Sequence, residues 1–227
     1  MCYSIESSLK TTALSLFAIV YLFHSSNPYF KWIAAGLIGW CGMQFAELLL
    51  WMTEPQHGCT KWNIIISVTL IPLALILQPL GALFGSFFVI PWNKSSSFRQ
   101  WFIILFSVIA IGSIIYIQLY QPEQLCTFVT PRGHLFWGKT KKPIHDTPSY
   151  VFLQAVWFLI IIIPIFLFWD KSLIFPILLL ITPLFGFLYG HYRTDSRGSI
   201  WCFYTSFTSI IASLLLFLKD NKIFHVL

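Results

Sequence analysis

Seven long apolar stretches run through this 227-residue chain and decide what it can fold into. Each comes close to the roughly 20 residues that an α-helix needs to cross the hydrocarbon core of a bilayer. Only 10% of the residues are charged. The sequence therefore predicts an all-α integral membrane bundle of seven transmembrane helices, several with proline kinks, in a single domain. The expected spans are residues 9–23, 28–52, 63–90, 100–120, 149–169, 172–190 and 199–218 of the domain 1–227.

The loops distinguish the two faces of this bundle better than charge does. An odd number of spans puts the termini on opposite faces, so the amino terminus shares its face with loops 53–62, 121–148 and 191–198. Lysine and arginine divide almost evenly between the faces, and the positive-inside rule gives no orientation. Cys59 and Cys126 both lie in loops of the amino-terminal face. A disulfide between them would make that face lumenal or extracellular, and two free thiols are the alternative.

Glu47 is the one formally charged residue deep inside any predicted span. Lipid offers a carboxylate no partner, so acidic residues within membrane helices are candidates for functional sites. Helical spacing places Trp40, Gln44, Glu47 and Trp51 on one face of the second span. We predict a polar pocket that opens to the amino-terminal face, with Gln44 orienting the carboxylate and the two tryptophans framing the cavity.

Residues on other spans reach a similar depth when each helical residue is counted as about 1.5 Å. Gln154 and Tyr204 are expected to complete the hydrogen bonds of Glu47, whereas Gln78 lies deeper and is not expected to contact it directly. Such a pocket would bind or transport a proton, a cation or a small cationic solute, without a cofactor. The alternative is that Gln44 and Glu47 only link helices, at around 1 kcal/mol or less per contact.

Small residues at helical spacing indicate where helices pack closely. Gly81 and Gly85 are four residues apart in the third span, and small side chains repeat along the seventh: Ser199, Cys202, Ser206, Ser209 and Ser213. Small side chains at this spacing let the backbones of membrane helices approach each other.

Histidines in the loops of the amino-terminal face support a second functional hypothesis. Imidazole is a common zinc ligand, which makes His57, His134 and His191 weak candidates for a metal site. They lack the close His-x-x-x-His spacing, so no metal is predicted. The alternative functions are therefore a membrane-embedded, lipid-modifying enzyme that uses loop histidines and a non-catalytic membrane scaffold; the chain is not predicted to be an enzyme.

Other functions of seven-helix and basic proteins are excluded by missing residues. No lysine lies between Lys171 and Lys219, so the last span cannot form a retinal Schiff base. The sequence also lacks the acidic-Arg-aromatic triplet of receptors and the paired histidines of membrane zinc hydrolases. Its basic residues are spread over short connections, which argues against nucleic acid as a partner. The expected partner is the lipid bilayer, and the sequence does not indicate an oligomeric state.

A series of short motifs carries a resemblance that covers most of the chain. In order they are Gln44-x-x-Glu47-x-x-x-Trp51, Cys59-x-x-x-Asn63, Gln78-Pro79, Cys126 with His134-Leu135-Phe136-Trp137, and Gly198-Ser199-x-Trp201-Cys202. In this order they resemble a family of uncharacterised polytopic membrane proteins of large DNA viruses and related microbial genomes. The resemblance implies a shared seven-helix topology and a shared site but names no reaction.

Overall fold

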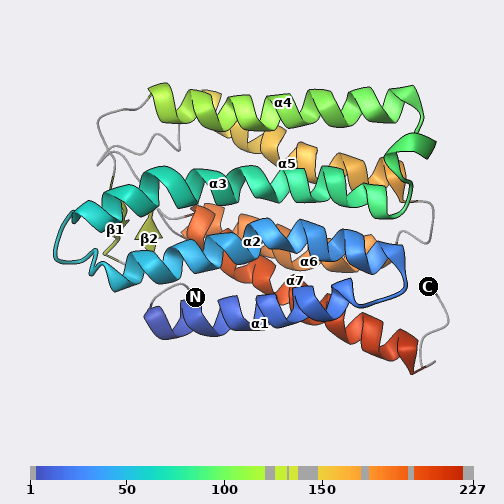
Figure 1. The fold of residues 1–227 in the computed structure, drawn as a ribbon. Coiled ribbons are helices and arrows are strands. Elements are labelled where there is room, and N and C mark those ends of the chain that lie inside the picture. Colours follow the sequence, from blue (N-terminus) through green and yellow to red (C-terminus); the bar gives the residue numbers. More distant parts are fainter. Residues whose placement is uncertain are drawn as a thin grey trace.

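Seven α-helices and one short β-hairpin make up the described part of the chain (Figure 1). The structure is a computed structural model that describes residues 4–120, 126–131, 133–137, 148–169, 174–193 and 197–221. The predicted all-α fold with seven helices is confirmed, and the hairpin is an addition that the apolar pattern did not indicate. The helices are α1 (Ile5–Phe23), α2 (Pro28–Met52), α3 (Lys61–Gly85), α4 (Ser97–Tyr120), α5 (Pro148–Phe168), α6 (Ile174–Arg193) and α7 (Arg197–Asp220), with 3-10 turns η1 (Ser86–Phe88) and η2 (Trp92–Lys94) between α3 and α4.

Polar caps decide where helices begin, and they move two boundaries from the predicted spans. The side chain of Ser4 accepts a hydrogen bond from a first-turn amide, so α1 begins at Ile5 and not at residue 9. Thr60 caps α3 in the same way, so that helix begins at Lys61 and not at residue 63. A capping side chain accepts a hydrogen bond from a backbone amide of the first turn, which has no acceptor within the helix. Because these residues are polar, a search for apolar stretches passes over them.

Five helices in the described ranges are long and apolar enough to cross a membrane, judged by length and composition. They are Ile5–Phe23, Pro28–Met52, Lys61–Phe88, Ser97–Tyr116 and Ser199–Asp220, and two shorter apolar helical segments are Val156–Phe168 and Pro176–Tyr189. Prolines do not end these helices: Pro72 and Pro79 lie inside α3, and Pro183 inside α6.

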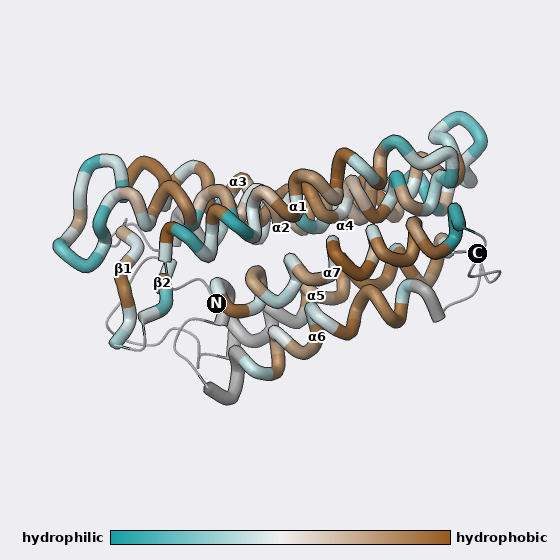
Figure 2. Tube along the Cα trace, turned by 90° about the horizontal axis from the view of Figure 1, so that it is seen from below, coloured by the Kyte–Doolittle hydropathy of each residue, from teal (hydrophilic) through white to brown (hydrophobic). Residues whose placement is uncertain are grey.

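Large apolar side chains cover the outside of the bundle. Phe17 of α1 is 71% exposed, Val108 of α4 is 63% exposed and Phe217 of α7 is 53% exposed. In water, a continuous apolar surface of this kind would drive association. Figure 2 shows hydrophilic residues gathered in the loops at both ends and mainly hydrophobic helices between them. The surface therefore fits a protein surrounded by lipid.

The helices lie in two layers, as Figure 2 shows. One layer holds α1, α2, α3 and α4, and the other holds α5, α6 and α7. Helix α2 packs against α1, α3 and α7, so it contacts both layers. A polar side chain on α2 is therefore enclosed by protein on several sides, which sets the environment of Glu47.

Glycines allow α2 and α3 to approach until their backbones touch. A Cβ atom built on Gly81 would lie 2.3 Å from the carbonyl oxygen of Ala35, and one built on Gly39 would lie 2.3 Å from the amide nitrogen of Gln78. Gly85 is similarly close to the Trp32 ring, at 2.7 Å. The predicted close packing at Gly81 and Gly85 is confirmed.

The hairpin consists of β1 (Phe128–Val129) and β2 (Leu135–Phe136), paired antiparallel. Its turn is closed by a 2.8 Å hydrogen bond from the Gly133 amide to the Thr130 carbonyl oxygen. Gly133 has a φ of 78°, a conformation that glycine adopts without steric cost. Residues 126–131 and 133–137 are called the hairpin segment below.

Candidate functional site

Glu47 lies in the protein interior, where a tryptophan of the hairpin segment binds its carboxylate. The Glu47 side chain is 0% exposed. Its Oε1 atom accepts a 3.1 Å hydrogen bond from Nε1 of Trp137. Trp137 directly follows β2, so the hairpin brings this donor to α2. Because a buried carboxylate needs hydrogen-bond donors to offset its lost hydration, the hairpin is part of the site.

Two more polar side chains join the site from α3 and α7. The amide nitrogen of Gln78 lies 3.8 Å from the sulfur of Cys202, and both residues are fully enclosed. The Glu47 carboxylate is close enough to the Cys202 thiol for the two groups to interact electrostatically. Gln78 thus contacts Cys202, and the expectation that it does not bind Glu47 directly stays a prediction. We call Glu47, Gln78, Trp137 and Cys202 the buried polar cluster.

Gln44 connects the first two helices. Its carbonyl oxygen accepts a 2.8 Å hydrogen bond from the hydroxyl group of Thr11 on α1, and Gln44 is 0% exposed. One turn away, the Cys41 thiol lies 3.8 Å from the carbonyl oxygen of Thr12. Gln44 therefore ties α1 to α2, and its predicted role in orienting Glu47 stays a prediction.

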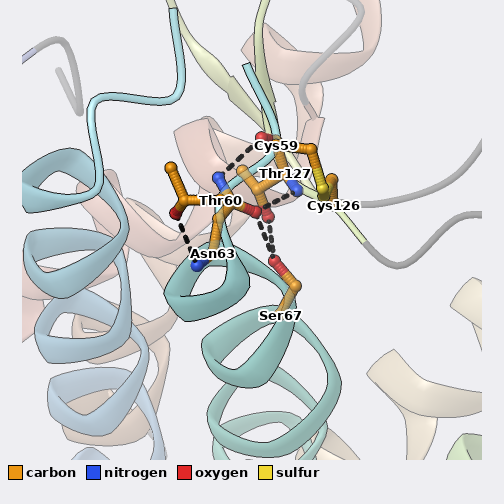
Figure 3. The surroundings of a disulfide bond; sticks show 6 residues. All are labelled: Cys59, Thr60, Asn63, Ser67, Cys126 and Thr127. Atoms are coloured by element: carbon orange, nitrogen blue, oxygen red, sulfur yellow. Dashed lines mark hydrogen bonds between the residues drawn. A yellow bond between two sulfur atoms is a disulfide. The ribbon is translucent and has the colours of Figure 1, made fainter. Parts of the chain in front are cut away.

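The hairpin segment is fastened to α3 by one asparagine (Figure 3). The side-chain amide of Asn63 donates to the Thr127 carbonyl oxygen at 3.0 Å, and the Thr127 backbone amide donates to the Asn63 side-chain oxygen at 2.8 Å. The hydroxyl groups of Ser67 and Thr127 add a third contact at 2.8 Å. Asn63 is 0% and Thr127 1% exposed. The side chain of Asn63 thus binds the hairpin backbone as a neighbouring strand would.

A disulfide between Cys59 and Cys126 fastens the same place covalently (Figure 3). The two Cα atoms are 5.8 Å apart, and the residues are separated by 67 positions in the sequence. The bond joins the α2–α3 loop to the beginning of the hairpin segment. The disulfide that the sequence suggested is therefore present, beside the Asn63 contacts that hold Thr127.

The two tryptophans predicted to frame a pocket lie on either side of Glu47 along α2. The ring of Trp40 meets the edge of Trp201 on α7, with centroids 6.2 Å apart. The indole N–H groups of Trp40 and Trp51 are buried and have no hydrogen-bond partner among the described residues. Their framing role stays a prediction.

The two residues predicted to complete the bonds of Glu47 have different outcomes. The structure places the ring of Tyr204 among aromatic residues of α6, 5.0 Å from Phe185 and 5.8 Å from Tyr189. Gln154 belongs to α5, but its side chain lies outside the described part. Trp137 donates a hydrogen bond to Glu47 that the sequence did not suggest, and a bond from Gln154 to Glu47 stays a prediction.

The three weak candidates for metal binding lie in different settings. Exposed His57 pairs with Glu54 at 3.1 Å, whereas His134 lies at the hairpin turn and is 2% exposed. His191 was expected in a loop, but it lies in α6, which continues to Arg193 because polar residues extend the helix past its apolar stretch. The side chain of His191 lies outside the described part. Among the described residues, no group of three His, Cys, Asp or Glu side chains could hold a metal ion.

Sequence reasoning did not assign a role to Trp137 or Asn63, and it treated Cys202 only as a small residue at a helix contact. All three occur in the short motifs of the resemblance given above, which was the available signal. No protein-family model matches the chain, and no match was found among curated proteins or solved structures. The resemblance to uncharacterised viral and microbial membrane proteins therefore stays a prediction.

Replacing Trp137 with phenylalanine tests the link between the hairpin and Glu47. The variant keeps an aromatic ring but loses the N–H donor, and a buried acceptor that loses a donor costs about 1–3 kcal/mol. We expect a lower melting temperature in detergent and faster hydrogen exchange in the hairpin segment. The matched control is Trp62→Phe, because Trp62 is 68% exposed and its replacement should change neither measurement. Equal stability of the two variants would contradict the proposed link.

Proposed function

We propose that the chain is a seven-helix integral membrane protein in which Glu47 binds and passes on a proton. In this arrangement the amino terminus and the hairpin segment lie on the lumenal or extracellular side. Five helices of sufficient length, two shorter apolar segments and the apolar outer surface support insertion in the membrane. The disulfide supports the orientation, since such bonds persist in oxidising compartments.

The complete burial of Glu47 carries this proposal. With a side chain that is 0% exposed, the carboxylate cannot meet a solute without movement of its surroundings. A proton needs no cavity, because it passes between groups that are hydrogen-bonded to one another or to water. Among a proton, a metal cation and a small cationic solute, burial therefore favours the proton. Acidic side chains inside membrane proteins commonly form such proton relays.

The neighbouring side chains provide a fixed setting for this reaction. Trp137 donates to Oε1 and so holds the carboxyl group in one orientation. The Trp137 indole comes from a hairpin that is fastened at Cys126 and Thr127. The hairpin would thus act as a cap on Glu47, and its attachment would control how protons reach the carboxyl group.

Proton flux into vesicles tests the proposal. The purified chain is reconstituted in liposomes that contain a pH-sensitive dye, the membrane potential is clamped with potassium and valinomycin, and a pH gradient is imposed. We expect faster flux than in protein-free vesicles, and we expect Glu47→Gln to reduce it to the protein-free rate. Glu54→Gln is the control, because Glu54 is an exposed carboxylate that pairs with His57 in a loop. Flux that is unchanged in Glu47→Gln would refute the proposal.

A structural role for Glu47 is the second candidate, and the Trp137 hydrogen bond favours it. In that case Glu47 anchors the hairpin, and the protein serves as a membrane scaffold. The wild-type chain would then show no flux above protein-free vesicles, while Glu47→Gln would lower the melting temperature. The two candidates are therefore separated by the flux of the wild-type protein alone.

A further inference from the structure

An apolar cavity lies between the two layers of helices. It has a volume of about 70 Å³ and is partly open to the outside. Its walls come mainly from α2 on one side and from α5 and α6 on the other, and none of the four residues of the buried polar cluster lines it. Trp40, which was predicted to frame a pocket around Glu47, does line the cavity, but the cavity is separate from the buried polar cluster.

Gly36 provides an independent sign of this empty space. It is buried and lines the cavity, yet a Cβ atom built on it would meet nothing within 4 Å. Gly39, on the same helix, differs because its hydrogen atoms face the backbone of α3 at close range. Close helix packing thus explains glycine at position 39 but not at position 36, where the missing side chain leaves the cavity open.

The walls select an apolar ligand with a narrow cross-section. The one hydroxyl group in the lining, on Thr208, is already bound to the Thr182 hydroxyl at 2.6 Å and the Leu179 carbonyl oxygen at 3.3 Å. Water needs about 2–4 polar partners to stay in a cavity, and these walls do not offer them. The volume is roughly half of the 150 Å³ or so in which benzene is bound. A segment of a hydrocarbon chain fits such a space better than a ring system.

Aromatic rings and two cations lie near one end of the cavity. There the ring of Trp169 packs against Tyr29 at 4.6 Å and Trp32 at 5.6 Å. These three rings are at most 8% exposed, so they lie inside the protein, and Tyr29 and Trp32 belong to the start of α2. Lys31 precedes Trp32, and the Lys219 ammonium group lies 5.6 Å from the ring of neighbouring Phe30. Two cations near the same end of α2 complement the phosphate of a lipid head group.

We propose that this cavity holds part of one acyl chain of a bilayer phospholipid, whose head group lies near Lys31 and Lys219. The chain enters between the layers and passes Gly36. This inference rests on membrane insertion as part of the proposed function, but it does not depend on proton transfer at Glu47.

A photoreactive phospholipid tests the proposal. The full chain is reconstituted with a phospholipid that carries a diazirine on its acyl chain, irradiated, and mapped by mass spectrometry. We expect labels concentrated on cavity-lining peptides of α2, α5 and α6. Gly36→Leu fills the cavity and should reduce these labels to the level of outward-facing peptides, and Gly36→Ala should reduce them partly. Gly112→Leu is the control, because Gly112 lies exposed on α4 with nothing within 4 Å and is not part of the cavity.

Three results would overturn the inference. Labels spread evenly over the outer surface and unaffected by Gly36→Leu would show an inserted protein without this site. Labelling of the cavity peptides by a photoreactive free fatty acid but not by the phospholipid would assign a different ligand. Absence of all labels, together with extraction of the chain by alkaline carbonate, would instead refute membrane insertion. A thermal melt of each variant ensures that only folded protein is compared.

Discussion

The Gly39→Ala variant is expected to lose much of its stability, whereas Gly36→Ala on the same helix is expected to keep it. A methyl group at position 39 would lie 2.3 Å from the amide nitrogen of Gln78, so α2 and α3 must move apart. Overpacking typically costs about 1–3 kcal/mol, and a backbone cannot rotate away as a side chain can. At position 36 the methyl group meets nothing within 4 Å, and alanine gains up to about 1 kcal/mol in helix propensity.

Thermal unfolding in detergent, followed by size-exclusion chromatography, measures this difference. The two variants control for each other, because both replace a buried glycine of α2 by alanine and differ only in what the methyl group meets. We expect the melting temperature of Gly39→Ala to fall well below that of the wild type and that of Gly36→Ala to stay level or rise. Equal melting temperatures would mean that the close contact between α2 and α3 is not required.

Removal of the disulfide is expected to have the second large effect. A disulfide typically contributes about 2–4 kcal/mol, more when it closes a long loop, and this one joins residues 67 positions apart. In Cys59→Ser/Cys126→Ser, the hydrogen bonds of Asn63 and Ser67 to Thr127 would remain to hold the start of the hairpin segment. We therefore expect a lower melting temperature and faster hydrogen exchange at Thr127 to Trp137, including the segment that binds Glu47.

A reductant provides the control for this prediction. Wild-type protein treated with dithiothreitol should acquire the exchange rates of the double variant, while the double variant itself should not respond. A response of the double variant would point to another effect of the reductant. Unchanged hydrogen exchange after loss of the disulfide would mean that Asn63 and Ser67 are sufficient to hold the hairpin.

The arrangement of helices along the chain could be predicted because it depends on the length of apolar stretches. The expected span 28–52 coincides with α2, and the seven expected spans correspond to the seven helices. The spacing of Gly81 and Gly85 also predicted a close helix contact, because two glycines four residues apart lie on one helix face and let another backbone approach. Each of these features depends on residues close together in the sequence, so a single stretch is sufficient to predict it.

The contact between Glu47 and Trp137 could not be predicted, because depth along a helix does not give direction around its axis. Tyr204 was expected near Glu47 from its depth, but its ring faces Phe185 and Tyr189. The donor that the structure describes, Trp137, comes from a loop segment distant in sequence from α2. Its hairpin has strands of two residues each, too short for an alternating pattern of apolar and polar residues. Such contacts join distant parts of the chain and depend on the whole fold.

The bond between Cys59 and Cys126 has a consequence for the order in which the protein is made. It closes a covalent ring that contains α3 and α4. With the proposed orientation, the ring could close once Cys126 has emerged from the ribosome and reached the lumenal or extracellular side. Synthesis of α5, α6 and α7 is not required for this step. Two helices of the first layer, α3 and α4, would therefore be joined in a covalent ring while the second layer is still being made, and the later helices would assemble beside this ring.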